Sequence, residues 1–397
     1  MAFLTNTKNK TPLGIYVHIP FCKSKCRYCD FYSRCNLDER SADSYLRAVC
    51  AHIREAGRLA PGYRVDTIYF GGGTPSYFGA EALATILTEL RRSFDVAGDA
   101  EITFEANPDS VSDSLLKRLR AEGFNRVSLG IQCDDDAILQ RIGRPHDYAQ
   151  AVSACQRIRK AGFDNLSLDL MFALPGQSRM MWEQTLENVL KLRPDHMSCY
   201  NLTLMPGTPM YEDRQHLSIV DEDTQADMYL SAVQILQRHG YHQYEISNFA
   251  KPGKRSAHNL KYWTGGEYLG FGPSASSDFA GKRYTIVPNL NTYLKGIRDG
   301  GQIIDEVEEI PFRERAGEYL MLRLRTTHGI SREEYEKRYL LDFAPLEQVL
   351  EQNQRQGLAR LTDGRWRLTP EGFLVSNRII ADLQLAQEGS RSFARRR

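Results

Sequence analysis

Short apolar runs alternate with longer segments of helical periodicity over the first two thirds of the chain. The predicted strands are Leu13–Ile19, Val65–Phe70, Glu101–Ala106, Arg126–Ile131, Asn165–Phe172 and Met197–Thr203. The predicted helices are Asp38–Arg58, Ala80–Phe94, Ser112–Glu122, Asp147–Ala161, Arg179–Lys191 and Asp221–His239. Strands that alternate with helices of this length form βαβ units around a parallel sheet. Six such units in a row favour an incomplete (βα) barrel over an ordinary open sheet.

The pattern changes after these units. Tyr241–Phe249 is a candidate for one further strand, whereas Lys251–Ser277 is rich in Gly, Pro, Ser and aromatic residues and is expected to form a long functional loop. From about Ile310, helical segments rich in Arg and Glu precede two short strands, Gly357–Leu361 and Arg365–Leu368, which flank an Asp-Gly turn. Helices followed by a small hairpin resemble a winged-helix module.

The expected organisation is therefore an α/β chain, a partial (βα)6 TIM-like barrel followed by a small helical, winged-helix-like domain. The expected parts are a tail (1–12), the barrel (13–245), a connecting segment (246–305), the C-terminal domain (306–385) and a basic tail (386–397). The basic tail carries several arginines at the end of the chain and is interpreted as a frayed end.

Charge and composition exclude several classes of protein. The 51 Lys and Arg balance 50 Asp and Glu, which argues against a nucleic-acid-binding protein that relies on a basic face. No apolar run approaches the ~20 residues that span a bilayer, and Met1–Thr11 has no signal-like segment. A cytoplasmic location is expected. In that reducing compartment, the eight cysteines favour a metal or redox role over disulfides.

Three cysteines lie close together in one segment. Cys22, Cys26 and Cys29 have three and then two intervening residues, so one loop can present all three to a single metal centre. Thiolates select iron–sulfur clusters or zinc. A structural zinc site needs a fourth ligand, for which His18 is the nearby candidate. A cluster with three thiolates instead leaves one iron open to an exogenous ligand.

The other cysteines have no ligand-like spacing and are expected to be buried as small hydrophobic side chains. They are Cys35, Cys50, Cys133, Cys155 and Cys199.

Polar residues follow several predicted strands at the same end. Gly71–Pro75 follows the second strand, and its three glycines let backbone approach a ligand closely. Glu105 and Asn107 follow the third strand, Gln132 follows the fourth, and Asp169 lies in the fifth. Because barrel active sites form at the carboxyl ends of the strands, these residues are expected to meet beside the cysteine loop.

The cysteine pattern resembles that of the radical S-adenosylmethionine (SAM) superfamily. This resemblance implies that Cys22, Cys26 and Cys29 hold a [4Fe-4S] cluster whose open iron chelates SAM. In that superfamily, electron transfer to the sulfonium gives a 5′-deoxyadenosyl radical, and the protein supplies placement and exclusion of water.

Within the superfamily, the chain is similar to the branch of the oxygen-independent coproporphyrinogen III oxidase and the heme chaperone HemW. The matching motifs are Tyr16–Cys22, Gly71–Pro75, Glu105–Pro108, Gly123–Gln132 and Asp169–Gly176, together with the C-terminal module. The resemblance implies that the SAM site is lined by Tyr16, Tyr28, Gly72, Gly73, Thr74, Glu105, Gln132, Arg144, Asp169 and Thr203. Arg144 is expected to pair with the SAM carboxylate, and Gln132 and Asp169 with its ribose.

Two departures distinguish the chain from the oxidase. Phe31 occupies the position of the oxidase's fourth cysteine, and only about a dozen residues precede the first strand. A third feature resembles the chaperone family, the HNxxYW motif formed by His258, Asn259, Tyr262 and Trp263. Imidazole is a good heme ligand, and aromatic rings stack on a porphyrin.

Other histidines remain candidates for the heme ligand. They are His18, His146, His196 and His242.

Three hypotheses follow from these features. The first is a heme chaperone with a radical SAM scaffold, which delivers heme to respiratory enzymes and has no assigned catalytic residue. The second is an oxygen-independent coproporphyrinogen III oxidase. The third is another radical SAM enzyme, such as a heme-degrading methyltransferase. The expected ligands are the cluster, SAM and heme, and a homodimer is conceivable although no heptad repeat supports it.

Overall fold

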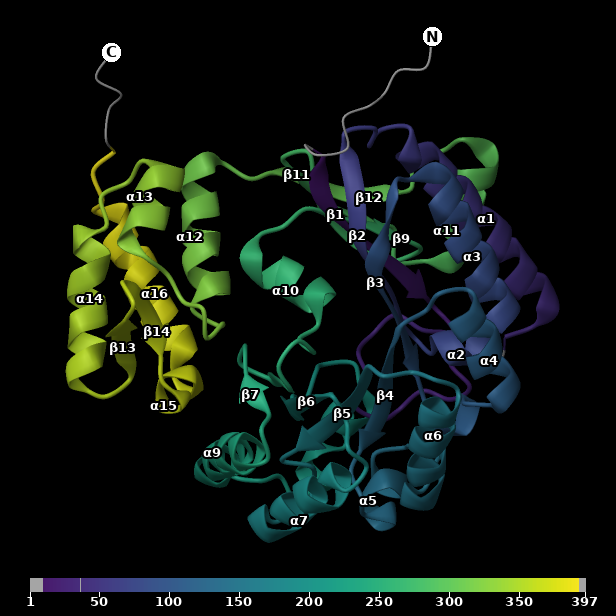
Figure 1. Cartoon of the computed structure of the whole chain (residues 1–397), viewed down its shortest axis with the longest axis horizontal. Coiled ribbons are helices and arrows are strands. Elements are labelled where there is room, and N and C mark those ends of the chain that lie inside the picture. Colours follow the sequence, from purple (N-terminus) through teal and green to yellow (C-terminus); the bar gives the residue numbers. More distant parts are fainter. Residues whose placement is uncertain (1–9, 36, 393–397) are drawn as a thin grey trace.

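Six parallel strands form the centre of the fold (Figure 1). The structure is a computed structural model that describes residues 10–35 and 37–392. The six strands lie side by side in chain order within a larger sheet. Their bounds are β1 (Thr11–Ile19), β2 (Tyr63–Gly72), β3 (Val96–Ala106), β4 (Arg126–Gln132), β5 (Leu166–Phe172) and β6 (His196–Asn201). Each adjacent pair is parallel, which confirms the predicted barrel order. The side chains of β4 are buried along its whole length, as expected for a strand inside a parallel sheet.

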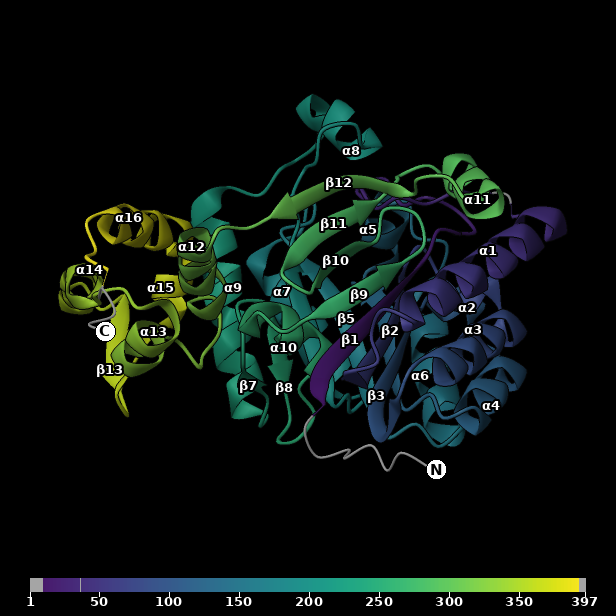
Figure 2. The same cartoon turned by 90° about the horizontal axis from the view of Figure 1, so that it is seen from above.

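Helices connect these strands and cover the outer face of the sheet (Figure 2). The main ones are α1 (Glu39–Gly57), α3 (Ala80–Ser93), α4 (Asp113–Ala121), α6 (Tyr148–Lys160), α7 (Arg179–Leu190) and α9 (Glu222–Arg238). All six were predicted to within two residues at each end. Most begin at a side-chain cap that accepts a backbone N–H, as Asp38 does for α1 and Ser112 for α4.

Shorter elements lie in the connections. They are α2 (Pro75–Phe78), α5 (Asp136–Arg141), α8 (Pro209–Glu212), α11 (Leu290–Asp299) and two 3₁₀ turns at Pro108–Ser110 and Arg214–His216.

The sheet continues on both sides of the six strands. Beyond β1 lie β9 (Tyr268–Phe271), β10 (Ser276–Phe279), β11 (Lys282–Ile286) and β12 (Ile304–Glu309). Beyond β6 lie β8 (Asn248–Ala250) and β7 (His242–Gln243), an antiparallel pair in place of the single strand predicted for this region.

The prediction of a long loop at Lys251–Ser277 was wrong. This segment contains helix α10 (Ala257–Thr264) as well as strand β9. The Ser256 side chain accepts the Asn259 N–H at the start of α10, and Gly265 ends the helix in the left-handed region with φ +65°. The Gly and Ser residues that suggested a loop are therefore the caps of a short helix.

The C-terminal module follows β12. Its elements are α12 (Phe312–Arg323), α13 (Arg332–Tyr339), α14 (Ala344–Arg355), β13 (Ala359–Thr362), β14 (Arg365–Leu368), α15 (Pro370–Leu374) and α16 (Ser376–Glu388). The predicted hairpin is confirmed, and Asp363 and Gly364 both have positive φ, as a tight hairpin turn requires. Residues 1–9 and 393–397, which include most of the predicted N-terminal tail and the end of the basic tail, lie outside the described residues.

Backbone hydrogen bonds join the module to the barrel. The Ile246 N–H donates to the Arg325 carbonyl at 2.9 Å, and the Thr327 N–H donates to the Tyr244 carbonyl at 3.0 Å. In Figure 1, α12 consequently stands beside α10, so a surface of the module faces the HNxxYW motif. Of the helices in the described residues, none is both long and apolar enough to cross a membrane.

Candidate functional site

A cavity of about 550 Å³ opens at the carboxyl ends of the parallel strands. The cysteine loop after β1 forms one wall, and residues at or beyond the ends of β2 to β6 form the rest. All three predicted cluster cysteines reach this cavity. The sequence prediction that strand-end residues meet the cysteine loop is therefore matched by the geometry.

The cysteine loop is tied to its neighbours by backbone hydrogen bonds. The Cys22 N–H donates to the Arg34 carbonyl at 3.0 Å, and the Arg27 N–H donates to the Ile142 carbonyl at 3.0 Å. Burial raises the pKa of the Cys22 thiol, and it raises the pKa of Cys29 to about 11. These thiols are protonated at neutral pH, so metal binding must release their protons.

The donor set fits an iron–sulfur cluster better than a zinc ion. Within residues 10–35 and 37–392, no three His, Cys, Asp or Glu side chains are already arranged around one metal ion. A cubane binds each thiolate through a different iron, so its three cysteines need not converge on one point. His18, the candidate fourth zinc ligand, has both ring nitrogens engaged, Nδ1 with the Tyr16 hydroxyl at 3.0 Å and Nε2 with the Tyr32 carbonyl at 2.8 Å.

Two glycines let the end of β2 press against the cysteine loop. A Cβ on Gly73 would lie 2.6 Å from the Phe21 carbonyl oxygen, closer than any side chain tolerates. Gly72 has φ +107°, and a Cβ there would lie 2.6 Å from the His18 ring. Space therefore requires glycine at position 73, and both space and backbone conformation favour it at position 72.

Two half-buried carboxyl groups, Glu105 and Asp169, line the cavity. Glu105 accepts the Tyr69 hydroxyl at 2.9 Å and the Gly72 N–H at 3.1 Å, and burial raises its pKa to about 7. Asp169 accepts the Ser128 hydroxyl at 2.9 Å, and burial also raises its pKa. Both groups have acceptor oxygens beside the cavity, where hydroxyl groups of a ligand can donate to them.

Arg144 supplies the positive charge nearest to the cysteine loop. Its guanidinium donates to Cys26 Sγ at 3.4 Å, to Asn107 Oδ1 at 2.8 Å and to the Gly130 carbonyl at 2.6 Å. Its Nε is buried and has no acceptor, which leaves a donor for a ligand anion. Nearby, Gln132 has φ +69°, an uncommon conformation for a residue other than glycine and one that clusters at functional sites.

Nine of the ten residues predicted to line the SAM site do line this cavity, and Tyr16 does not. The Tyr16 ring lies behind the wall, stacked on Tyr69 with 6.3 Å between ring centroids. The lining residues that were not predicted as site residues include Tyr69, Met171, Tyr200 and Met205. Tyr69 and Tyr200 lie near the carboxyl ends of β2 and β6. The rule that barrel active sites form at these strand ends could therefore have predicted both residues.

The HNxxYW motif lies outside this cavity. His258 is 1% exposed, and its Nδ1 and Nε2 atoms contact the hydroxyls of Thr67 at 2.9 Å and Tyr262 at 2.8 Å. Burial lowers the pKa of His258 to about 3, so the imidazole is neutral. Its ring stacks on Tyr69, with 5.2 Å between centroids. Ligation of iron by His258 therefore requires one of these hydrogen bonds to break.

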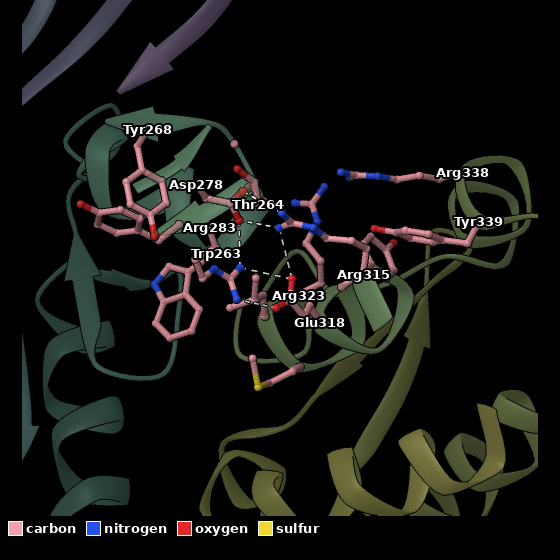
Figure 3. A pocket seen from close by; sticks show the side chains of 16 residues that line it. Trp263, Thr264, Tyr268, Asp278, Arg283, Arg315, Glu318, Arg323, Arg338 and Tyr339 are labelled. Atoms are coloured by element: carbon pink, nitrogen blue, oxygen red, sulfur yellow. Dashed lines mark hydrogen bonds and ion pairs between the residues drawn. The ribbon is translucent and has the colours of Figure 1, made fainter. Parts of the chain in front are cut away.

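The other aromatic residues of the motif line a second cavity (Figure 3). Tyr262 and Trp263 face the C-terminal module across a space of about 280 Å³. Asn259 is half-buried and does not line either cavity. The motif is thus divided between the barrel interior, where His258 lies, and the boundary between the two parts of the chain.

Comparison with known proteins gives consistent results over most of the chain. The radical SAM superfamily model matches residues 16–215, and the HemN C-terminal domain model matches residues 310–375. The heme chaperone HemW of Bacillus subtilis is 35% identical, over 92% of this chain and 97% of that protein. The HemW proteins of Lactococcus lactis and Escherichia coli are 36% and 33% identical, with at least 93% of this chain covered.

A solved structure shows the same fold. It is the coproporphyrinogen III oxidase HemN of Escherichia coli, with a TM-score of 0.83 and 24% identity over 95% of this chain and 91% of that one. The predicted α/β fold of the radical SAM type is confirmed by this match and by the strand order.

Proposed function

Because the chain belongs to the radical SAM superfamily and, within it, to the heme chaperone HemW family, we propose that it binds heme and transfers it to another protein. The observation that carries this proposal is identity of 33–36% to proteins named heme chaperones, over more than nine tenths of both chains. On the same resemblance, the recipients would be respiratory heme proteins.

The alternative, a coproporphyrinogen III oxidase, has less support. The oxidase structure shares the fold at only 24% identity. Phe31, at the position of the oxidase's fourth cysteine, is 62% exposed and lies on the cavity wall. A phenyl ring there supplies neither a thiol nor a proton. This residue therefore favours a chain that binds the cofactors without decarboxylating a porphyrinogen.

The first cavity is our proposed cofactor site. Cys22, Cys26 and Cys29 would hold the [4Fe-4S] cluster, which when bound supplies an open iron for SAM and a route for one electron. Arg144, with its free Nε, would bind the SAM carboxylate. Asp169 would accept ribose hydroxyls.

The remaining cavity residues would enclose SAM. Gln132 would bind its ribose and Tyr28 would flank its adenine, while Gly72, Gly73, Thr74, Glu105 and Thr203 complete the wall.

The HNxxYW motif is our proposed heme site. Tyr262 and Trp263 would form an aromatic wall for the porphyrin, and Asn259 lies on the same helix. His258 would serve as iron ligand only after its contact with the Tyr262 hydroxyl breaks, since both of its nitrogens are engaged. Tyr16 would act indirectly, as support for Tyr69.

A hemin titration tests the function. The anaerobically reconstituted chain should give a saturable Soret band at one equivalent, with and without SAM, and absence of saturation would refute heme binding. His258→Ala should change the bound spectrum, whereas the control His242→Ala, at an exposed position on β7, should not.

Incubation with coproporphyrinogen III, SAM and reductant should yield no protoporphyrinogen, and steady turnover would restore the oxidase hypothesis.

A further inference from the structure

The second cavity is built by both parts of the chain. Its barrel side consists of the end of α10 and residues of β9, β10 and β11, and its other side consists of residues of α12 and α13. Aromatic rings form much of its surface, among them Trp263, Tyr268 and Tyr339 (Figure 3). Such a surface suits a flat aromatic ligand that is held between the barrel and the module.

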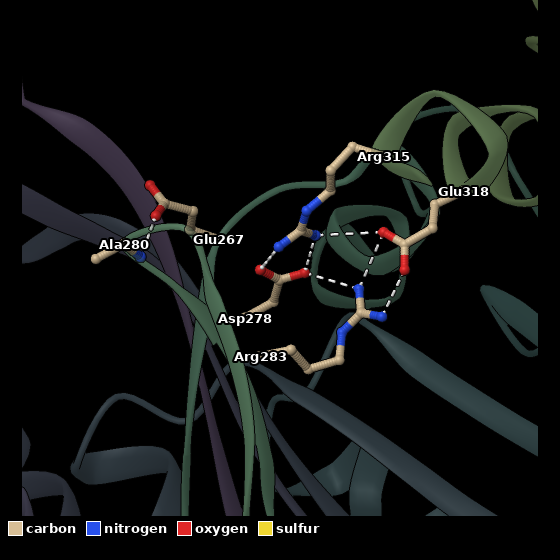
Figure 4. Close-up of polar contacts among 6 residues, drawn as sticks. All are labelled: Glu267, Asp278, Ala280, Arg283, Arg315 and Glu318. Carbon is tan, nitrogen blue, oxygen red and sulfur yellow. Dashed lines mark hydrogen bonds and ion pairs between the residues drawn. The ribbon is translucent and has the colours of Figure 1, made fainter. Parts of the chain in front are cut away.

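Four charged residues at this boundary neutralise one another (Figure 4). The Asp278 carboxylate contacts Arg283 at 2.8 Å and also pairs with Arg315. Glu318 contacts Arg283 at 2.6 Å and Arg315 at 3.3 Å. Two guanidinium groups and two carboxylates thus form a network of ion pairs with no net charge. This network fixes α12 against β10 and β11.

Two further arginines line the cavity without a full set of partners. Arg323 shares the Glu334 carboxylate with Arg365, at 2.9 and 2.6 Å, and its own Nε is buried without an acceptor. Arg338 forms no ion pair with the described residues and lies beside the Tyr339 ring at 5.4 Å. The cavity lining therefore carries four arginines against two acidic residues, a surplus of two positive charges.

A buried hydroxyl adds another available donor. Tyr319 is 4% exposed, lines the cavity, and has no hydrogen-bond partner for its hydroxyl group within residues 10–35 and 37–392. Its nearest acidic neighbour, Glu334, is already bound by two arginines. Buried donors without acceptors are uncommon, and here the two residues that carry them, Arg323 and Tyr319, line the same cavity.

We propose that the second cavity binds the carboxylate edge of a planar aromatic dianion, with Arg323 and Arg338 as a two-arginine clamp. The inference rests on the proposed function insofar as the ligand is heme, whose two propionates match the surplus of two positive charges. Guanidinium groups bind carboxylates through paired hydrogen bonds, and Trp263 supplies a face for the ring. A volume of about 280 Å³ encloses one edge of such a macrocycle and leaves the rest outside.

This arrangement makes the C-terminal module part of the ligand site. The clamp lies on α12 and α13, whereas the aromatic wall of Tyr262 and Trp263 lies on α10. The ligand would consequently touch both parts of the chain.

The test compares hemin with its dimethyl ester, which has the same ring and iron but no free carboxylates. The full chain is titrated with each, in the same mild detergent, as wild type and as the double variant Arg323→Lys/Arg338→Ala. Lysine keeps the positive charge beside Glu334 but lacks the Nε donor and the paired N–H donors of a guanidinium group. Lys337→Ala is the matched control, because Lys337 is an exposed cation on the same helix and does not line the cavity.

The clamp predicts that the double variant loses hemin affinity on the order of tenfold or more, the effect of charge-assisted hydrogen bonds. The ester should bind wild type and variant equally, and Lys337→Ala should leave both affinities unchanged. Equal hemin affinity in wild type and variant, or equal losses for hemin and ester, would overturn the clamp while the chaperone function stands. Failure of wild type to bind either compound would overturn the proposed function itself.

Discussion

Replacing Glu105 by Gln should raise the free energy of unfolding of the cofactor-free chain relative to wild type. This difference should grow as pH rises from about 4.5 to 7. Burial, together with the nearby Asp169 charge, raises the pKa of Glu105 from 4.5 to about 7, although the hydrogen bond from Tyr69 opposes the rise. Between these values the folded chain holds a proton that the unfolded chain has already lost. The free energy of unfolding therefore falls as pH rises through this interval, and above about pH 7 the loss is complete.

The size of the effect follows from the change in pKa. A rise from 4.5 to about 7 corresponds to at most about 3 kcal/mol, since the carboxyl borders an open cavity where water screens it. Gln keeps the shape and accepts the Tyr69 hydroxyl but does not titrate. Its loss of the second hydrogen bond, from the Gly72 N–H, is independent of pH and cancels when values at different pH are compared.

Urea unfolding of both chains at pH 4.5, 6, 7 and 8 measures the difference. Glu245, whose pKa burial also raises to about 7, titrates in both chains and cancels. Glu306→Gln, at an exposed position on β12, is the control and should show no such growth. A difference between Glu105→Gln and wild type that stays flat across this range would refute the reasoning.

Two other substitutions test the cysteine loop and the turn beside it. Cys26→Ser should abolish the broad iron–sulfur absorption after anaerobic reconstitution, whereas Cys155→Ser, buried in α6, should retain it; equal spectra would remove Cys26 as a ligand. Gly73→Ala should destabilise the chain by about 1–3 kcal/mol and weaken cluster retention, because its Cβ meets backbone oxygen at 2.6 Å. Gly98→Ala, with open space around its Cβ, should change neither the thermal midpoint nor the cluster absorption, and similar effects of both changes would contradict the steric argument.

The barrel was predictable because its signals are local and repeated. Most of the strands β1 to β6 contain a short run rich in apolar residues, and the helices that follow them have one apolar face. The strand-end rule then placed Glu105, Gln132 and Asp169 at one cavity without knowledge of any contact.

The remaining structure carried weaker signals. β12 has the sequence Ile-Asp-Glu-Val-Glu-Glu and is almost wholly exposed, so no alternation of apolar and polar residues marks it as a strand. Helix α10 is eight residues long and follows a Gly- and Pro-containing segment. The environment of His258 depends on Thr67 and Tyr69, nearly two hundred residues away, and no pattern within the motif reveals such contacts.

Tyr69 has a consequence for how experiments on the two sites are interpreted. Its hydroxyl donates to Glu105 at the first cavity, and its ring stacks on the imidazole of His258. His258 in turn contacts the hydroxyl of Tyr262 at the second cavity. Tyr69 thus lines the first cavity and is linked to the second through His258 and Tyr262. Free energies of substitutions made on opposite sides of it should not be additive, because contacting residues couple. The effect of a Tyr69 substitution therefore cannot be assigned to one ligand, because the substitution alters contacts at both cavities.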